Sequence, residues 1–127
     1  MPRKGGVRLG ELQLRIMRVL WDVDGATVSE VRDRLGQPRL AYTTVATMLR
    51  KMEDRGLVDH QEAGRKFHYR ALVSGDEVTR SMAGDLVERL FCGSLTDAVS
   101  HLLENHEISS EELDRLEQLI QQRKNTP

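Results

Sequence analysis

Apolar residues recur at helical spacing near the start of the chain. The first stretch with this spacing contains Leu12, Ile16, Val19, Leu20 and Val23. It predicts an amphipathic helix over residues 9–22. Further on, Thr27 and Glu30 have the spacing of a capping box, in which the threonine oxygen accepts a hydrogen bond from a first-turn amide and the glutamate reaches back to the cap. A second helix is therefore expected over residues 28–35, ended by Gly36.

The sharpest helical pattern in the chain lies over residues 41–55. Its apolar stripe consists of Val45, Met48, Leu49 and Met52. At about 100° per residue, the opposite side carries Thr43, Thr47, Arg50 and Lys51, with Thr44 on its flank. We expect the stripe to face the core and the other side, which combines hydroxyls with cations, to face solvent.

Two short runs with partial alternation of apolar and polar residues follow this helix. They cover residues 57–62 and 67–72, and the segment Ala63-Gly64-Arg65-Lys66 joins them. Because alternation is typical of half-buried strands and glycine favours a tight turn, the pattern predicts a β-hairpin with a basic tip.

The rest of the chain is helical in pattern, in three pieces over residues 76–92, 95–105 and 110–123. Ser94 and Ser109 stand where the second and third pieces begin and are expected to cap them. The apolar stripes of the three pieces include Leu86, Leu90, Val99, Leu102, Leu103, Leu113, Leu116 and Ile120. Three short helices without a sheet make a poor core on their own, so we expect these residues to be buried by a second copy of the chain.

Charge divides the chain at the same place as the pattern. The 127 residues have a net charge of −1, yet residues 1–73 hold 14 Lys and Arg against 9 Asp and Glu, whereas residues 74–127 hold 5 against 11. Because cations gain by displacing counterions from phosphates and carboxylates are repelled by them, only the first part is suited to a polyanion. We therefore expect two domains, residues 1–73 and residues 74–127.

Composition excludes several classes of protein. Cys92 is the single cysteine, which excludes an internal disulfide framework and a cysteine-rich zinc site. No apolar run approaches the roughly 18 residues of a membrane span, and no signal-peptide pattern follows Met1, so a cytoplasmic protein is expected. The patterns of a nucleophile elbow or a glycine-rich phosphate loop are absent as well, and we expect no enzyme.

The order of three helices and a hairpin with a basic tip is that of a winged helix, a helix-turn-helix variant whose third helix enters the major groove of DNA. The expected fold is thus mainly α with a small β-hairpin wing, followed by a helical dimerisation domain. Short hydroxyl side chains suit base edges and cations suit phosphates. The candidate DNA-binding residues are Tyr42, Thr43, Thr44, Thr47, Arg50, Lys51, Arg65 and Lys66, with Arg3, Lys4 and Arg8 as a candidate N-terminal arm. The alternative is a protein-protein adaptor without specific DNA binding.

Several segments of the first 73 residues also carry a family resemblance. They are LGELQ (9–13), VLW (19–21), TVSEV (27–31), LAYTTVATML (40–49), KMEDRGLV (51–58) and GRKFHY (64–69). In their combined spacing they resemble the BlaI/MecI-type penicillinase repressors. The resemblance implies a homodimeric transcriptional repressor of a two-fold symmetric operator, which dimerises through its C-terminal helices. In the better-known branch, repression ends when a membrane sensor triggers proteolysis in the dimerisation region.

The resemblance also assigns roles by position. Thr43, Thr44 and Thr47 match base-reading positions, Lys51 matches a phosphate-contacting position, and Arg65 matches the wing. The candidate cleavage region is His101–Leu102. Because the antibiotic-resistance repressors have an Asn-Phe pair there, this departure argues against cleavage at the same bond. A copper-responsive branch uses paired Cys-x-Cys motifs, which this chain lacks.

The histidines and the cysteine have simpler interpretations than a metal or redox site. His101 and Glu104 share a helix face near His106, but such a pair supplies too few ligands, and we expect neither metal nor cofactor. His60 and His68 fall on opposite strands of the hairpin and are expected to face solvent or DNA phosphate. Cys92 is expected to be a small buried hydrophobe.

Overall fold

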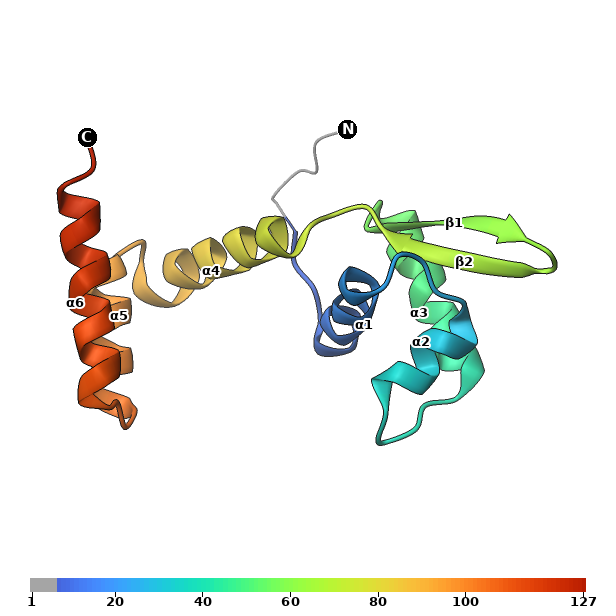
Figure 1. The fold of residues 1–127 in the computed structure, drawn as a ribbon, viewed down its shortest axis with the longest axis horizontal. Coiled ribbons are helices and arrows are strands. Elements are labelled where there is room, and N and C mark those ends of the chain that lie inside the picture. The colour runs from blue at the N-terminus through green and yellow to red at the C-terminus, as the bar shows by residue number, and fades with distance from the viewer. Residues whose placement is uncertain (1–6) are drawn as a thin grey trace. The chain divides into compact units, whose positions relative to one another are not determined.

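The structure is a computed structural model and describes residues 7–127. Eight elements follow the order that the sequence predicts, and their ends differ from the expected ones by no more than two residues. They are α1 (Glu11–Asp22), α2 (Val28–Leu35), α3 (Tyr42–Asp54), β1 (Val58–Ala63), β2 (Lys66–Ala71), α4 (Gly75–Phe91), α5 (Leu95–Asn105) and α6 (Ser110–Lys124) (Figure 1). The expected fold class, mainly helical with a two-stranded wing, is confirmed.

The core of the first part lies where α1, α2 and α3 meet the hairpin. Val45, Leu49 and Met52 of α3 are fully buried, as the stripe predicts, whereas Met48 is half-buried. The other fully buried large side chains are Ile16, Met17, Val31, Leu57, Val58 and Val78. Burial of these side chains is the main source of stability for the three-helix arrangement, because each one contributes about 1.5–3 kcal/mol relative to an exposed position.

The hairpin is joined to the start of α2 as well as to α3. The two-residue turn Gly64-Arg65 pairs Ala63 with Lys66, and this register places His60 opposite Tyr69. Ala26, just before α2, then adds to the outer side of β2 through two backbone hydrogen bonds with Tyr69, of 2.9 and 2.8 Å. The base of the wing is therefore held on both sides.

The predicted helix caps are present. Thr27 Oγ1 accepts from the Glu30 amide at 3.2 Å, and the Glu30 carboxylate accepts from the Thr27 amide at 3.0 Å. Hydrogen bonds from Thr27 lower the pKa of Glu30, and the nearby charges of His68 and Lys66 act in the same direction. At the starts of α5 and α6, the hydroxyl oxygens of Ser94 and Ser109 accept from the amides of Asp97 and Glu112. Local sequence therefore defines where these helices begin.

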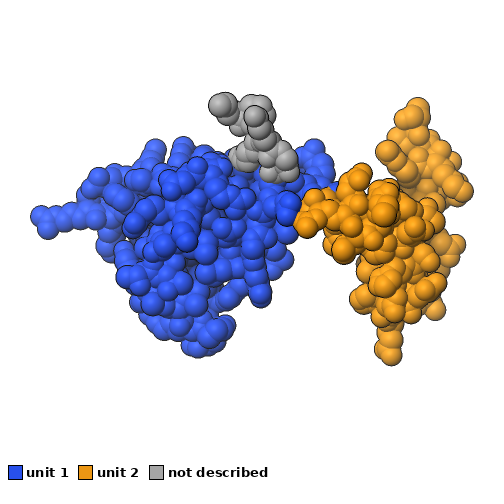
Figure 2. All heavy atoms as spheres, turned by 180° about the vertical axis from the view of Figure 1, so that it is seen from behind, with its two compact units in different colours: residues 1–84 blue, residues 85–127 orange. Residues whose placement is uncertain are grey.

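The chain divides into two units within α4, between Gly84 and Asp85 (Figure 2). The sequence places the change of charge and pattern at residue 74 instead. The difference arises because the first turns of α4 pack with the winged helix. Val78 is buried in the first core, and Ser81 Oγ accepts a 2.7 Å hydrogen bond from the Val7 amide. In addition, the indole N–H of Trp21 donates to the Val73 carbonyl at 2.8 Å, just before the helix starts.

The second unit, residues 85–127, has little core of its own. Ala98 is the only one of these residues that is buried, and none of α6 is buried. Its exposed large apolar residues are Leu86, Leu90, Leu95, Val99, Leu102, Leu103, Leu113, Leu119 and Ile120. Leu116 is half-buried, beside an apolar groove of about 640 Å³ between α5 and α6. Among residues 7–127, no helix is long and apolar enough to cross a bilayer.

The expectation for Cys92 is wrong. The side chain is exposed, and the residue has a φ of 51°, followed by Gly93 with a φ of 83°. Because the chain leaves α4 through this left-handed turn, residue 92 lies outside the helical pattern that suggested burial.

Candidate nucleic-acid interface

One face of α3 presents the residues that the sequence singles out for DNA. Thr43, Thr44, Thr47, Arg50 and Lys51 are all exposed, on the side away from the buried stripe. Tyr42 begins the helix and is 48% exposed. The helix therefore offers hydroxyl and cationic groups to a partner along its whole length.

A groove of about 370 Å³ lies between α3 and the wing. Tyr42, Ala46 and Arg50 line it from α3, and Arg65, Lys66 and Phe67 line it from the wing, with Thr27, Val28, Ser29 and Tyr69 completing it. Among these described lining residues, three are cationic and none is acidic. The fold thus brings together four of the predicted residues, Tyr42, Arg50, Arg65 and Lys66. Thr43, Thr44, Thr47 and Lys51 lie on α3 outside this groove.

Six of the residues that line the groove were not predicted from the sequence, and two of these six are exposed. Phe67 is 44% exposed at the start of β2, and Ser29 is exposed in the first turn of α2. The alternation along the strands could have identified Phe67. A two-residue turn at Gly64-Arg65 puts residue 67 on the same face as residues 60 and 69. The candidate interface therefore contains an exposed aromatic side chain next to the two cations of the tip.

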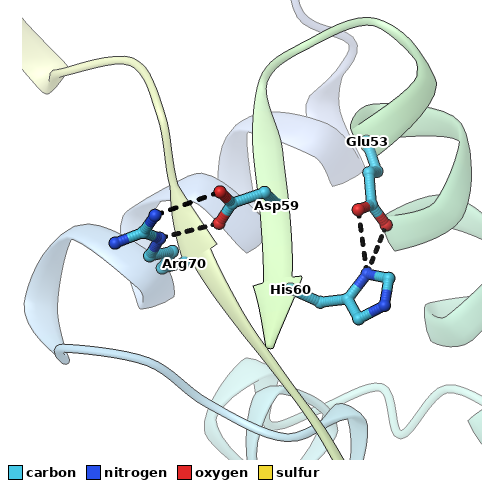
Figure 3. Close-up of polar contacts among 4 residues, drawn as sticks. All are labelled: Glu53, Asp59, His60 and Arg70. Carbon is cyan, nitrogen blue, oxygen red and sulfur yellow. Dashed lines mark hydrogen bonds and ion pairs between the residues drawn. The ribbon is translucent and has the colours of Figure 1, made fainter. Parts of the chain in front are cut away.

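His60 does not face solvent or a DNA phosphate, contrary to the expectation. Its Nδ1 atom lies 2.8 Å from each carboxylate oxygen of Glu53, near the end of α3 (Figure 3). The register explains this contact, because alternate residues of β1 point to the face that packs on α3. His68 lies on the other face of the hairpin, so the two histidines are separated by the sheet.

The other face of the hairpin carries an ion pair. Arg70 and Asp59 are directly opposite each other, and Figure 3 shows the two hydrogen bonds that join them. The hydrogen bond from Arg70 lowers the pKa of Asp59, and the same bond raises the pKa of Arg70. Burial, followed by the charge of Glu53, raises the pKa of Tyr69, so the phenol is neutral.

Comparison with known proteins decides the family. The model of the penicillinase repressor family matches residues 9–122, which is nearly the whole chain. The chain belongs to the penicillinase repressor family. Its relatives include the penicillinase repressor of Bacillus licheniformis, 26% identical over 119 residues that cover 93% of each chain. They also include the transcriptional regulator BlaI of Mycobacterium tuberculosis, 31% identical over 116 residues that cover 89% of this chain and 83% of that one.

A more distant relative is the methicillin resistance regulatory protein MecI of Staphylococcus aureus, 16% identical over 88% of this chain and 92% of that one. The resemblance stated from the sequence is thereby confirmed, and the chain is a transcriptional repressor of BlaI/MecI type. The family consists of repressors and not of enzymes, which also confirms the expected class.

The remaining candidate residues of this penicillinase repressor homologue are those of the N-terminal arm and of the cleavage region. Arg3 and Lys4 of the candidate arm are outside the described residues, whereas the Arg8 carbonyl accepts a 2.7 Å hydrogen bond from Arg55. His101 and Leu102 lie in the middle of α5, both exposed. No group of three or more potential metal ligands occurs in the part of the chain that the structure describes.

Proposed function

We propose that the protein is a homodimeric repressor that binds a two-fold symmetric operator, with α3 in the major groove and the wing on an adjacent stretch of backbone. The observation that carries the proposal is that α3 and the wing both present exposed basic side chains, three of them around one groove, while α3 also presents exposed hydroxyls. Threonines 43, 44 and 47 are assigned to base edges, together with Tyr42 at the start of the helix. Arg50, Lys51, Arg65 and Lys66 are assigned to phosphates.

The charge of the groove supports this assignment. Arg50, Arg65 and Lys66 approach one concave surface from two different elements, without a carboxylate among the described residues that line it. Like charges destabilise one another when they converge, so a surface of this kind gains from a polyanion that neutralises it. A DNA backbone supplies negative charge at regular spacing and releases counterions when it binds.

The second unit supports the homodimer. Leu86, Leu90, Val99, Leu102, Leu103, Leu113 and Ile120 are all exposed in a single chain, and Leu116 lines the open groove between α5 and α6. Exposed apolar side chains in this number are typical of an interaction site, and a two-fold dimer buries the same residues on both copies. Two winged helices linked in this way suit the two halves of a symmetric operator.

Derepression is assigned to a signal that acts on the C-terminal unit. In line with the resemblance, we include proteolysis by a membrane sensor protease, with His101–Leu102 as the candidate region. Both residues lie within a helix, and a helical bond must unfold locally before a protease can cut it. Mass spectrometry of the protein from induced cells tests this step, because cleavage there leaves a fragment that ends at His101.

The test of the proposed function is a binding measurement. Purified protein is titrated into fluorescently labelled DNA from upstream of its own gene, and into a scrambled control, by anisotropy over a series of salt concentrations. We expect one dimer per palindromic site, a clear preference over scrambled DNA, and weaker binding at higher salt. Equal binding to both DNAs at every salt concentration contradicts operator recognition and favours the adaptor.

A further inference from the structure

The His60 side chain connects α3 with the wing. Its Nδ1 atom lies 2.8 Å from both Oε1 and Oε2 of Glu53, and the two side chains are 31% and 29% exposed. A carboxylate has acceptors only, so Nδ1 must carry the proton that it donates. Charge-assisted hydrogen bonds of this length are stronger than neutral ones. The contact therefore ties a strand of the wing to the last turns of the helix that carries the candidate base-reading residues (Figure 3).

The same imidazole ring also supports the aromatic side of the groove. It stacks on Phe67, with ring centroids 4.1 Å apart and an angle of 25° between the planes. It also contacts Tyr69, directly opposite on β2, with centroids 5.4 Å apart and an angle of 46°. Tyr69 is buried, whereas Phe67 is exposed and lines the groove. His60 thus stands between the carboxylate of α3 and the exposed aromatic wall of the wing.

The position of His60 along the strand gives it this role. Val58 is buried at the base of β1, Asp59 and His60 are half-buried, and the last three residues of the strand are exposed. His60 is therefore the last residue of β1 that is partly covered before the strand runs to the tip. Beyond it, backbone pairing joins β1 to β2, and pairing alone leaves a two-stranded ribbon free to twist relative to the helix.

We propose that His60 is a positioning residue of the DNA interface, which holds the wing at a defined angle to α3 through Glu53 and orients Phe67 in the groove. This inference rests on the proposed function in so far as the positioned groups serve DNA. His60 itself contacts no DNA in this assignment. It determines where Arg65, Lys66 and Phe67 stand relative to the threonines of α3, and so acts through them.

The first test does not involve DNA. Three variants separate the two contacts: His60→Phe keeps an aromatic ring but loses the donor, His60→Gln keeps a donor but loses the stacking, and Glu53→Gln keeps an acceptor. His68→Phe, on the opposite face of the same hairpin, is the matched control. NMR relaxation of the amides of residues 64–66 and the chemical shifts of the Phe67 ring protons report the order and orientation of the wing.

We expect order parameters at residues 64–66 to fall from about 0.85 to below about 0.6 in His60→Phe, while Glu53→Gln and the control stay near the wild type. His60→Gln is expected to move the Phe67 ring resonances, because the ring current of the imidazole is lost. Circular dichroism melting curves confirm that each variant is folded. Unchanged wing order in His60→Phe together with unchanged Phe67 shifts in His60→Gln overturns the proposal, whatever the protein binds.

The second test adds the operator. His60→Phe is expected to bind about three- to tenfold more weakly, which is the range for loss of one hydrogen bond, with an unchanged salt slope because no phosphate contact is removed. The operator affinity of Glu53→Gln is expected to remain within about twofold of the wild type, because glutamine still offers His60 an acceptor. If the wild type binds operator and His60→Phe binds equally well, the positioning role fails while the proposed function stands. If the wild type shows no preference for operator, the proposed function fails, and the NMR result decides the role of His60 separately.

Discussion

Asp59 and Arg70 face each other across the wing, with Arg70 Nε 2.7 Å from Asp59 Oδ1 and Nη2 3.1 Å from Oδ2. Both nitrogens of one guanidinium edge thus bind both oxygens of one carboxylate. This geometry is the favourable one for an arginine and a carboxylate, and it joins the two strands on the face opposite to His60. The wing is therefore held by side-chain contacts on both of its faces.

The ion pair predicts how stability depends on pH. Arg70 lowers the pKa of Asp59 below the ordinary value of 3.8, so the folded state favours the carboxylate more than the unfolded state does. The contribution of the ion pair to the stability of the folded state is present above the pKa that Asp59 has in the unfolded chain. It is lost as the pH falls through the lower pKa that Asp59 has in the folded state. We expect the wild type to melt at a higher temperature than Asp59→Asn at neutral pH. The difference between the two melting temperatures should close below about pH 4. A gap that stays constant down to the most acidic pH contradicts the prediction.

Thr44 and Thr47 are exposed on α3 and are assigned to base edges. Replacing both with alanine removes their hydroxyls without changing any charge. We expect operator affinity to fall by about 1–3 kcal/mol for each base contact that is lost, whereas affinity for scrambled DNA changes little. Anisotropy titrations on both DNAs measure the ratio. An equal loss on operator and scrambled DNA means that these threonines do not read bases.

Lys51 is assigned to a phosphate, and this assignment has a salt signature. Lys51→Ala should weaken binding to every sequence and reduce the slope of log affinity against log salt by about 1. Lys124→Ala is the matched control, because Lys124 is an exposed lysine at the end of α6. The control should leave the slope unchanged. The same slope in Lys51→Ala and in the wild type removes Lys51 from the phosphate contacts.

The proposed dimer interface offers a matched pair of leucines. Leu86 of the second unit and Leu72 at the end of the wing are each 47% exposed in the single chain. Leu86→Asp places a charge where the partner copy is expected to bury it, at a cost of several kcal/mol, so this variant should sediment as a monomer. Leu72→Asp should remain a dimer. Analytical ultracentrifugation at micromolar concentration distinguishes the two, and a dimeric Leu86→Asp excludes residue 86 from the interface.

Gly84 predicts a gain in stability. It lies in the interior of α4, and a Cβ added there meets nothing within 4 Å. Alanine should therefore stabilise the helix by about 1 kcal/mol, because glycine loses more backbone freedom on folding. Chemical denaturation of wild type and Gly84→Ala measures the difference. A lower stability in the variant means that α4 is not a continuous helix through this residue in solution.

The helices and the exposed hydroxyl and basic side of α3 could be predicted from the sequence because periodicity carries that information. The spacing of Val45, Leu49 and Met52 determines which face of α3 is buried. Thr27 and Glu30 mark the start of α2. The contact between Glu53 and His60 could not be predicted in the same way. It depends on the register of the hairpin and on the approach of β1 to α3, and a slip of one residue would turn His60 to the other face.

The other differences have similar physical causes. Cys92 follows the helical pattern of α4 in sequence but takes a left-handed conformation, which only the course of the chain into α5 requires. Phe67 would count as a core residue by its type, yet the register leaves it exposed in the groove. The division within α4 depends on which turns of one continuous helix pack on the first core, and a change of charge at residue 74 does not report that packing.

The backbone bridge between Ala26 and Tyr69 has a consequence for how the protein opens. Ala26 belongs to the loop before α2, and Tyr69 belongs to β2. Because these two residues are hydrogen-bonded to each other, the base of the hairpin cannot separate without also releasing that loop. The tip has no such attachment. Hydrogen exchange in the wing should therefore follow two regimes: amides near Tyr69 exchange only with the global unfolding of the first unit, and those near Gly64 exchange through local fraying.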